Sequence, residues 1–119
     1  MNKLVLSIVI PTKNRQKYCI GAVKQILSLN LKNIEICIQD NSDTAELKEI
    51  FTKKEYKDIV VYNYLPGILS FVDNFSHAVA LCKGKYICMI GDDDGIMPDI
   101  MHAVHYADEM HIIGRQICH

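Results

Sequence analysis

Residues 4–11 read LVLSIVIP, and residues 34–42 read IEICIQDNS. The first segment is an almost continuous run of Val, Ile and Leu, which is typical of a strand covered on both faces. In the second, isoleucines alternate with more polar residues and predict another strand. Between them, apolar residues recur at helical spacing over residues 18–29. A strand, a helix and a strand in this order predict a βαβ unit with parallel strands and a right-handed crossover.

The chain continues to alternate between the two kinds of element. Residues 59–64 and 86–90 predict two more strands. Residues 43–54 predict a short helix that begins at Ser42 or Asp43 as its N-cap. Alternation of this kind is typical of an α/β fold, in which helices cover both faces of a mainly parallel sheet.

Two helices are expected in the second half of the chain. The first begins at Ser70, which forms a capping-box pattern with Asp73, and it ends at Gly84. The second runs from about Pro98 to His111. The apolar stripe that the first of these helices would turn inward consists of Phe71, Phe75, Ala78, Val79 and Cys82.

Composition excludes several classes of protein. The chain has 119 residues, 50% of them hydrophobic, and a formal net charge of -1, so one folded domain is expected and disorder is not. Charges this balanced do not indicate a nucleic-acid partner, and no apolar run reaches the length of a membrane span. Five Cys without a CxxC pair favour reduced thiols in the cytoplasm. The sequence also lacks the Gly-rich dinucleotide motif, a Walker A motif and a serine-hydrolase elbow.

Polar residues follow three of the expected strands. They read PTKNR at 11–15, DNS at 40–42 and GDDD at 91–94. The carboxyl ends of parallel strands lie at one edge of a sheet, where ligands bind. The adjacent carboxylates at 92–94 repel one another unless a cation lies near them, and oxygen ligands suit Mg²⁺, Mn²⁺ or Ca²⁺. The alternative is a solvent-exposed acidic turn that caps the next helix.

Together these segments resemble the family 2 glycosyltransferases of the GT-A fold. The resemblance rests on LSIVIPTKNR at 6–15, IEICIQDNS at 34–42 and GKYICMIGDDD at 84–94, followed by MPD at 97–99. It implies a Rossmann-like nucleotide-diphospho-sugar transferase fold. In that fold the second strand lies between the first and the third, and the fourth lies on the other side of the first.

The resemblance also implies a role for each strand end. Asn41 would accept a hydrogen bond from a uracil N–H, and Asp40 before it would orient the loop. Asp92 would lie near the ribose. Asp93 would bind Mn²⁺ or Mg²⁺, with Asp94 as a second ligand or as loop support. The residues that would pass beside the base, ribose and phosphates are Pro11, Thr12, Lys13, Asn14 and Arg15.

The implied activity is inverting transfer of a sugar from a nucleoside diphosphate sugar, with UDP-sugars favoured, to an acceptor hydroxyl. The acceptor would be a saccharide or a lipid-linked molecule in polysaccharide or glycoconjugate biosynthesis. The chain ends about 25 residues after Asp94. We therefore expect a truncated fold, one domain over residues 1–119 that holds the donor part, with the acceptor half and the catalytic base absent. The alternatives are a nucleotide-binding fragment without turnover and a noncatalytic α/β interaction domain.

Two further expectations concern assembly and location. A donor part without its partner half would expose apolar surface, which favours a symmetric homodimer. The location expected is the cytoplasm, either free or peripheral at the inner face of the membrane. No nucleic-acid partner is expected.

Overall fold

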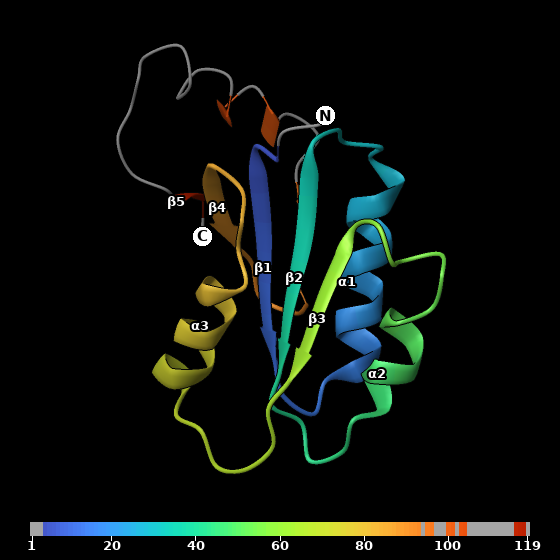
Figure 1. Ribbon diagram of the computed structural model, residues 1–119, viewed down its shortest axis with the longest axis vertical. Helices are drawn as coiled ribbons and strands as arrows, with labels where there is room; N and C mark the ends of the chain where they lie inside the picture. Colours follow the sequence, from blue (N-terminus) through green and yellow to red (C-terminus); the bar gives the residue numbers. More distant parts are fainter. Residues whose placement is uncertain (1–3, 94, 97–99, 102, 105–115, 119) are drawn as a thin grey trace.

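The computed structural model describes residues 4–93, 95–96, 100–101, 103–104 and 116–118 of the chain (Figure 1). For residues 116–118 it describes the backbone. The helix expected from Pro98 to His111 falls largely outside this part of the chain. Within it, no helix is both long and apolar enough to cross a membrane.

A parallel sheet of five strands forms the centre of the molecule, in the order β3-β2-β1-β4-β5. The order of the first four strands confirms the expectation, since the second lies between the first and third and the fourth pairs with the first. The last strand was not expected, because three residues are too few to carry a periodic pattern. The strands are β1 Leu6–Thr12, β2 Ile34–Asp40, β3 Val60–Tyr64, β4 Tyr86–Met89 and β5 Gln116–Cys118.

Helices cover both faces of the sheet, as expected (Figure 1). On one face α1 (Gln16–Ser28) and α2 (Glu46–Phe51) pack against the main apolar cluster, which includes Ile8, Ile36 and Val23. On the other face α3 (Phe71–Ala80) packs against a smaller cluster around Val9 and Cys37. Strand β1 therefore lies in the interior with apolar side chains on both faces, which explains its unbroken apolar run.

The expected N-cap of α2 is wrong. The helix begins after Ala45 and has no side-chain cap. The hydroxyl of Ser42 instead accepts a hydrogen bond from the backbone N–H of Asn14, at 2.8 Å, and the carboxylate of Asp43 accepts one from the Asn14 amide, at 3.1 Å. Both side chains connect the loop after β2 to the loop after β1. They are therefore engaged in positioning these two loops.

The cap of α3 is confirmed, but its apolar stripe is only partly right. The Ser70 hydroxyl accepts a hydrogen bond from the Asp73 backbone N–H at 3.0 Å. Phe71, expected to face inward, is 71% exposed. The helix contacts the sheet mainly through Ala78 and its neighbours toward the carboxyl end, and in its first turn Phe71 and Val72 stay exposed while Asn74 is buried.

The cysteines also depart from the expectation of five reduced thiols. Cys19 and Cys37 are buried free thiols that pack like small apolar residues. Cys88 on β4, in contrast, is disulfide-bonded. The sequence could not indicate this, because a disulfide depends on which strands become neighbours and not on the spacing of cysteines along the chain.

Candidate functional site

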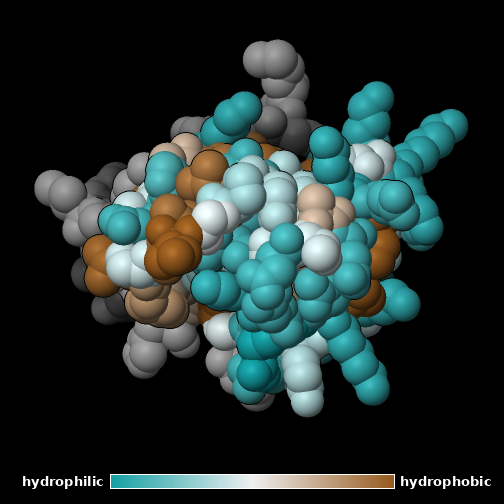
Figure 2. Space-filling model, turned by 90° about the horizontal axis from the view of Figure 1, so that it is seen from below, coloured by the Kyte–Doolittle hydropathy of each residue, from teal (hydrophilic) through white to brown (hydrophobic). Residues whose placement is uncertain are grey.

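The loops that follow β1, β2 and β4 meet at the carboxyl-end edge of the sheet. Thr12 and Asp40 are partners at the end of the β1–β2 ladder, and the backbone N–H of Asn41 donates to the carbonyl of Thr12 at 2.9 Å. Strand β4 delivers Asp92 to the same edge, where it contacts Thr12. Figure 2 looks onto this edge and shows that hydrophilic side chains cover most of it. The structure thus brings together the three polar segments singled out in the sequence.

Asp92 connects the loop after β4 to the loop after β1. One carboxylate oxygen accepts from the Thr12 hydroxyl and the other from Nε of Arg15, each at 2.9 Å. The side chain of Asp92 is only 11% exposed and that of Arg15 is 45% exposed, so the carboxylate of this ion pair is shielded from water and the guanidinium is not. Both oxygens have protein partners. Asp92 therefore orders the site from within.

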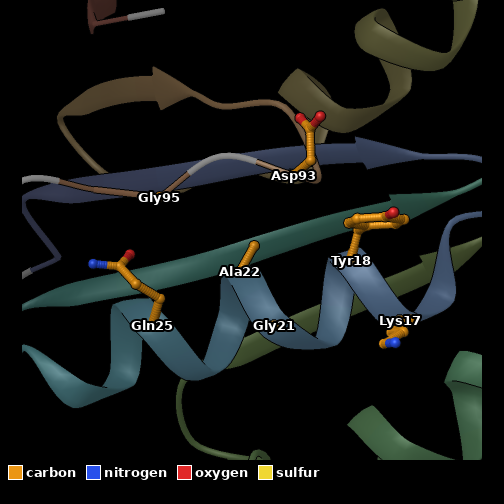
Figure 3. A pocket seen from close by; sticks show the side chains of 7 residues that line it. All are labelled: Lys17, Tyr18, Gly21, Ala22, Gln25, Asp93 and Gly95. Atoms are coloured by element: carbon orange, nitrogen blue, oxygen red, sulfur yellow. The ribbon is translucent and has the colours of Figure 1, made fainter.

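Asp93 presents its carboxylate to the surface. Its side chain is 56% exposed, and one oxygen lies 3.3 Å from a terminal guanidinium nitrogen of Arg15. Figure 3 shows that this carboxylate points away from α1. The neighbouring Asp94 lies outside the described residues.

An exposed carboxylate at this place fits a hard divalent cation. In the part of the chain that the structure describes, no three His, Cys, Asp or Glu residues form a cluster that could hold a metal ion. Mg²⁺, however, is usually held by one or two carboxylates together with substrate phosphates and water. The donor atoms of Asp93 suit that kind of site, in which the ligand completes the coordination shell.

The loop after β2 is held by buried hydrogen bonds. Asp40 is fully buried, and its carboxylate accepts from the backbone N–H of Ser42 at 2.9 Å and from the Tyr62 hydroxyl at 2.6 Å. Burial, helped by the hydrogen bond to Asp40, raises the pKa of Tyr62, so this hydroxyl stays a donor. Asp40 therefore fixes the start of the loop after β2.

Asn41 has a defined orientation. Its Nδ2 donates to the carbonyl oxygens of Leu65 and Gly67, at 2.8 and 2.9 Å. Both amide hydrogens are thereby used by the protein, which leaves Oδ1 as the acceptor for any further partner. The contact also attaches the loop after β3 to the site.

The residues of the basic segment after β1 lie in different environments. Asn14 adopts a left-handed backbone conformation, with φ of 55°, and bonds to Ser42 and Asp43. Lys13 is exposed and Pro11 is half-buried. Arg15 turns toward the acidic residues after β4. Side-chain contacts join four of the expected site residues, Thr12, Arg15, Asp92 and Asp93, and a backbone hydrogen bond joins Asn41 to Thr12.

Tyr18 is a neighbour that the sequence reasoning missed. The Arg15 guanidinium lies over its ring, 4.5 Å from the centroid, and the two residues are three positions apart at the start of α1. That spacing was the available signal, because residues three apart on a helix face each other. A pocket of about 460 Å³ lies beside this ring. The residues that line the pocket are Lys17, Tyr18, Gly21, Ala22, Gln25, Asp93 and Gly95 (Figure 3).

Comparison with known proteins identifies the family. The sequence model of glycosyl transferase family 2 matches residues 7–117. Similar proteins include abequosyltransferase RfbV of Salmonella typhimurium, which is 31% identical over 81% of this chain and 30% of its own length. WcaA of Escherichia coli K12, named as a colanic acid biosynthesis glycosyl transferase, is 30% identical over 91% of this chain and 43% of its own length.

The name of a third relative states its substrates. The Escherichia coli UDP-Glc:alpha-D-GlcNAc-diphosphoundecaprenol beta-1,3-glucosyltransferase WfaP is 29% identical over 87% of this chain and 41% of its own length. The chain thus spans between 30% and 43% of the length of these three relatives. The family match, in contrast, covers nearly all of the chain and includes the three strand ends that form the site. The chain belongs to glycosyl transferase family 2.

Proposed function

We propose that residues 1–119 form the donor-binding part of an inverting glycosyltransferase. It would bind a nucleoside diphosphate sugar and take part in sugar transfer to an acceptor hydroxyl in polysaccharide or glycoconjugate biosynthesis. The observation that carries this proposal is the arrangement of one sheet edge. There an amide with only its oxygen left to bond, Asn41, shares an edge with an exposed carboxylate, Asp93. These groups suit the base end and the diphosphate end of a nucleotide.

The base would lie over the ends of β1 and β2. Oδ1 of Asn41 would accept the N–H of uracil, which favours UDP over nucleotides whose bases lack a donor there. Lys13 is exposed beside it and would lay its alkyl stem along the base. Thr12 and Asn14 hold the loop around it.

Asp92 would contact the ribose while keeping its two protein partners. A carboxylate has about four acceptor positions, so a ribose hydroxyl can be added to the bonds from Thr12 and Arg15. In this role Asp92 would bind the ribose and would also hold the acidic turn in place.

Asp93 would hold Mn²⁺ or Mg²⁺, and we propose Asp94 as a second ligand or loop support. The ion would neutralise the charge that develops on the leaving diphosphate. Arg15 is close enough to Asp93 to exchange partners between that carboxylate and a phosphate. In this proposal the protein contributes to the chemistry by placing the carboxylate of Asp93 and the guanidinium of Arg15 at the same edge of the sheet.

The acceptor proposed is a saccharide or a lipid-linked saccharide. One relative is named for an acceptor on diphosphoundecaprenol, which is a membrane lipid. We accordingly propose that the protein works in the cytoplasm, close to the inner face of the membrane. This acceptor class sets the substrates for a transfer assay.

Calorimetric titration with UDP, GDP and dTDP, each with Mn²⁺ and with chelator, tests the donor proposal. We expect UDP to bind more tightly than GDP, and Mn²⁺ to strengthen UDP binding. Equal affinities with and without the metal would contradict the metal role, and no binding of any of the three would contradict the donor role. A transfer assay then separates a working enzyme from a fragment that only binds nucleotide.

A further inference from the structure

A side chain of α1 holds the segment that follows the acidic residues of the site. Gln25 bonds to both backbone groups of Ile96: its Oε1 accepts from the N–H at 2.8 Å, and its Nε2 donates to the carbonyl at 2.9 Å. In Figure 3 the side chain of Gln25 extends from α1 on the side of Gly95. An amide carries an acceptor and donors in one plane, so it can make both bonds at once, which a carboxylate or an ammonium group cannot. We call these two bonds the Gln25–Ile96 contact.

The Gln25–Ile96 contact lies at the far end of the turn that carries Asp93. At the near end, both carboxylate oxygens of Asp92 have protein partners. At the far end, the side chain of Ile96 is buried in the main apolar cluster, and its backbone is bonded to Gln25. Asp93 therefore lies between two fixed points of the chain.

Packing gives this turn limited support on the side of α1. The pocket of about 460 Å³ lies between them, and its lining includes the small residues Gly21 and Ala22 on the helix and Asp93 and Gly95 on the turn (Figure 3). Open space of this size leaves the turn with few van der Waals contacts on that side. The position of the turn therefore depends on the bonds at its two ends.

We propose that Gln25 is a positioning residue for Asp93. By holding Ile96 it fixes the backbone of the acidic turn, so that the carboxylate of Asp93 is in place for a divalent cation that binds together with a nucleoside diphosphate. A ligand that has to order the turn itself binds less tightly, because ordering each residue costs conformational entropy. The inference rests on the proposed function, which places the ion at Asp93.

Gln25→Met tests the contribution of the contact to metal binding. Methionine keeps an unbranched side chain of similar length but cannot make the pair of bonds. Loss of a group that orients a metal ligand typically lowers metal affinity about 10- to 100-fold. In calorimetric titrations the gain in UDP affinity that Mn²⁺ gives should therefore fall about tenfold, while UDP affinity in chelator stays unchanged. Gln16→Met, the same substitution at another half-buried position on α1, is the matched control and should keep the full gain.

Hydrogen exchange at the Ile96 amide gives a readout that needs neither metal nor nucleotide. In the free protein this N–H donates to Gln25. Gln25→Met should therefore speed its exchange several-fold, through local opening of the turn, and Gln16→Met should not. An unchanged exchange rate at Ile96 in Gln25→Met would overturn the proposal, because other contacts would then hold the turn.

Gly95→Ala offers a second way to break the contact. A Cβ at this position would lie 2.9 Å from Oε1 of Gln25, and the flexible end of that side chain would move away at little cost to the fold. Gly95→Ala should therefore lower the gain from Mn²⁺ as Gln25→Met does, and the double variant should lower it no further. Additive losses would overturn the proposal, because the two residues would then act on the ion independently.

The titrations also keep this inference apart from the proposed function. A wild type whose UDP affinity does not depend on Mn²⁺ would overturn the metal role in the proposed function and the inference with it. A wild type that depends on Mn²⁺, together with a Gln25→Met protein that keeps the full gain, would overturn the inference alone. Equal losses of UDP affinity with Mn²⁺ and with chelator would mean that Gln25 supports the fold in general, and would overturn the inference as well.

Discussion

The guanidinium of Arg15 contacts both Asp92 and Asp93 and lies over the ring of Tyr18. It thereby offsets the repulsion between adjacent carboxylates that the sequence pattern presents. The contact to Asp92 is the shorter and more buried one, and the contact to Asp93 is longer and exposed. A divalent cation bound at Asp93, as proposed, would therefore replace Arg15 there and leave the pair between Arg15 and Asp92 in place.

Asp93→Asn should remove the Mn²⁺-dependent part of UDP binding, because it keeps the shape of the side chain and deletes the charge that attracts the ion. The melting temperature should stay nearly unchanged, since the side chain is more than half exposed. Titration with Mn²⁺ and with chelator measures the effect. Asp58→Asn, at another exposed position, is the matched control. UDP affinity equal to that of the wild type in Mn²⁺ would show that the carboxylate of Asp93 does not hold the ion.

Asn41→Ala should weaken UDP binding with or without metal, by about 1–3 kcal/mol if a base N–H is left unpaired. It also removes the bonds to Leu65 and Gly67, so the protein should unfold at lower denaturant concentration. Asn41→Asp separates the two effects, because it keeps the base acceptor but cannot donate to the carbonyls. Of the two variants, Asn41→Asp should bind UDP more tightly, whereas Asn41→Ala should have the higher free energy of unfolding. UDP titration and urea unfolding measure the two quantities. Unchanged UDP affinity in Asn41→Ala would remove this residue from the base contact.

Cys19 provides a prediction on pH. Burial, and then the charges of Asp92 and Asp40, raise its pKa from 9.0 to about 12. Below pH 9 the thiol is protonated in the folded and unfolded chains alike, so its contribution to stability is fully present there. Between about pH 9 and 12 only the unfolded chain loses this proton, and stability falls as pH rises.

Cys19→Ala should abolish this part of the alkaline loss of stability, which is at most about 1.4 kcal/mol per pH unit. The measurement is the difference in free energy of unfolding between wild type and variant, from urea titrations between about pH 8 and pH 11. That difference should shrink as pH rises. Parallel curves for the two proteins would mean that the thiol ionises equally in both states.

At the scale of residues, sequence could predict which side chains meet but not how they bond. The order of strands places Thr12, Asp40 and Asp92 at one edge, and the structure brings them there. The turn of Arg15 toward the acidic residues, and the two bonds that orient Asn41, depend on the positions of neighbouring loops. No periodic pattern along the chain carries that information.

At the scale of elements, Gly84 allows the segment between α3 and β4 to pass close to the backbone of β1. A Cβ at this position would lie 2.7 Å from Oγ and 2.8 Å from the backbone nitrogen of Ser7. The Gly84 N–H donates to the same hydroxyl, which in turn donates to the buried carboxylate of Glu35. One hydrogen-bond network thus connects the segment between α3 and β4 to strands β1 and β2.

Gly84→Ala should destabilise the protein by about 2–3 kcal/mol, because backbone atoms of β1 cannot move aside easily. Gly21→Ala is the matched control: it lies inside α1 with no atom within 4 Å of an added Cβ, and it should stabilise by about 0.5–1 kcal/mol. Urea unfolding of the two variants tests the pair. A Gly84→Ala protein as stable as the wild type would mean that the contact relaxes without cost.

Strand β1 was predictable because its apolar run is unbroken, and α1 because its buried residues recur at helical spacing. The apolar runs of β1 and β2 and the helical spacing in α1 correspond to elements that the structure contains. The N-cap of α2 was not predictable, because Ser42 and Asp43 form hydrogen bonds with Asn14, which is about 28 residues earlier in the chain. The exposure of Phe71 escaped prediction for the same kind of reason, because it depends on where α3 leaves the sheet.

At the scale of the whole molecule, the site is assembled from segments that are far apart in the sequence. Thr12 and Asp92 are 80 residues apart, and Asn41 and Gly67 are 26 apart. A ligand that spans this edge would contact loops from β1, β2 and β4 at once, and so oppose the separation of those strands on unfolding. Ligand binding should therefore be visible in the stability of the whole domain. The expected symmetric dimer stays a prediction, and sedimentation without lipid tests it.

Metal and nucleotide should stabilise the protein cooperatively. Asp93 alone offers Mn²⁺ few ligands, and a diphosphate alone meets the repulsion of the acidic turn, so each partner supplies what the other lacks. Mn²⁺ alone and UDP alone should each raise the melting temperature slightly, and the two together by more than the sum. Full saturation at about 100 times the dissociation constant would add about 2.7 kcal/mol to the free energy of unfolding. Scanning calorimetry in the four combinations measures this, with Asp93→Asn as the variant in which the excess should vanish. Strictly additive shifts in the wild type would mean that ion and nucleotide bind at separate places, and the acidic turn would then act only as a polar cap.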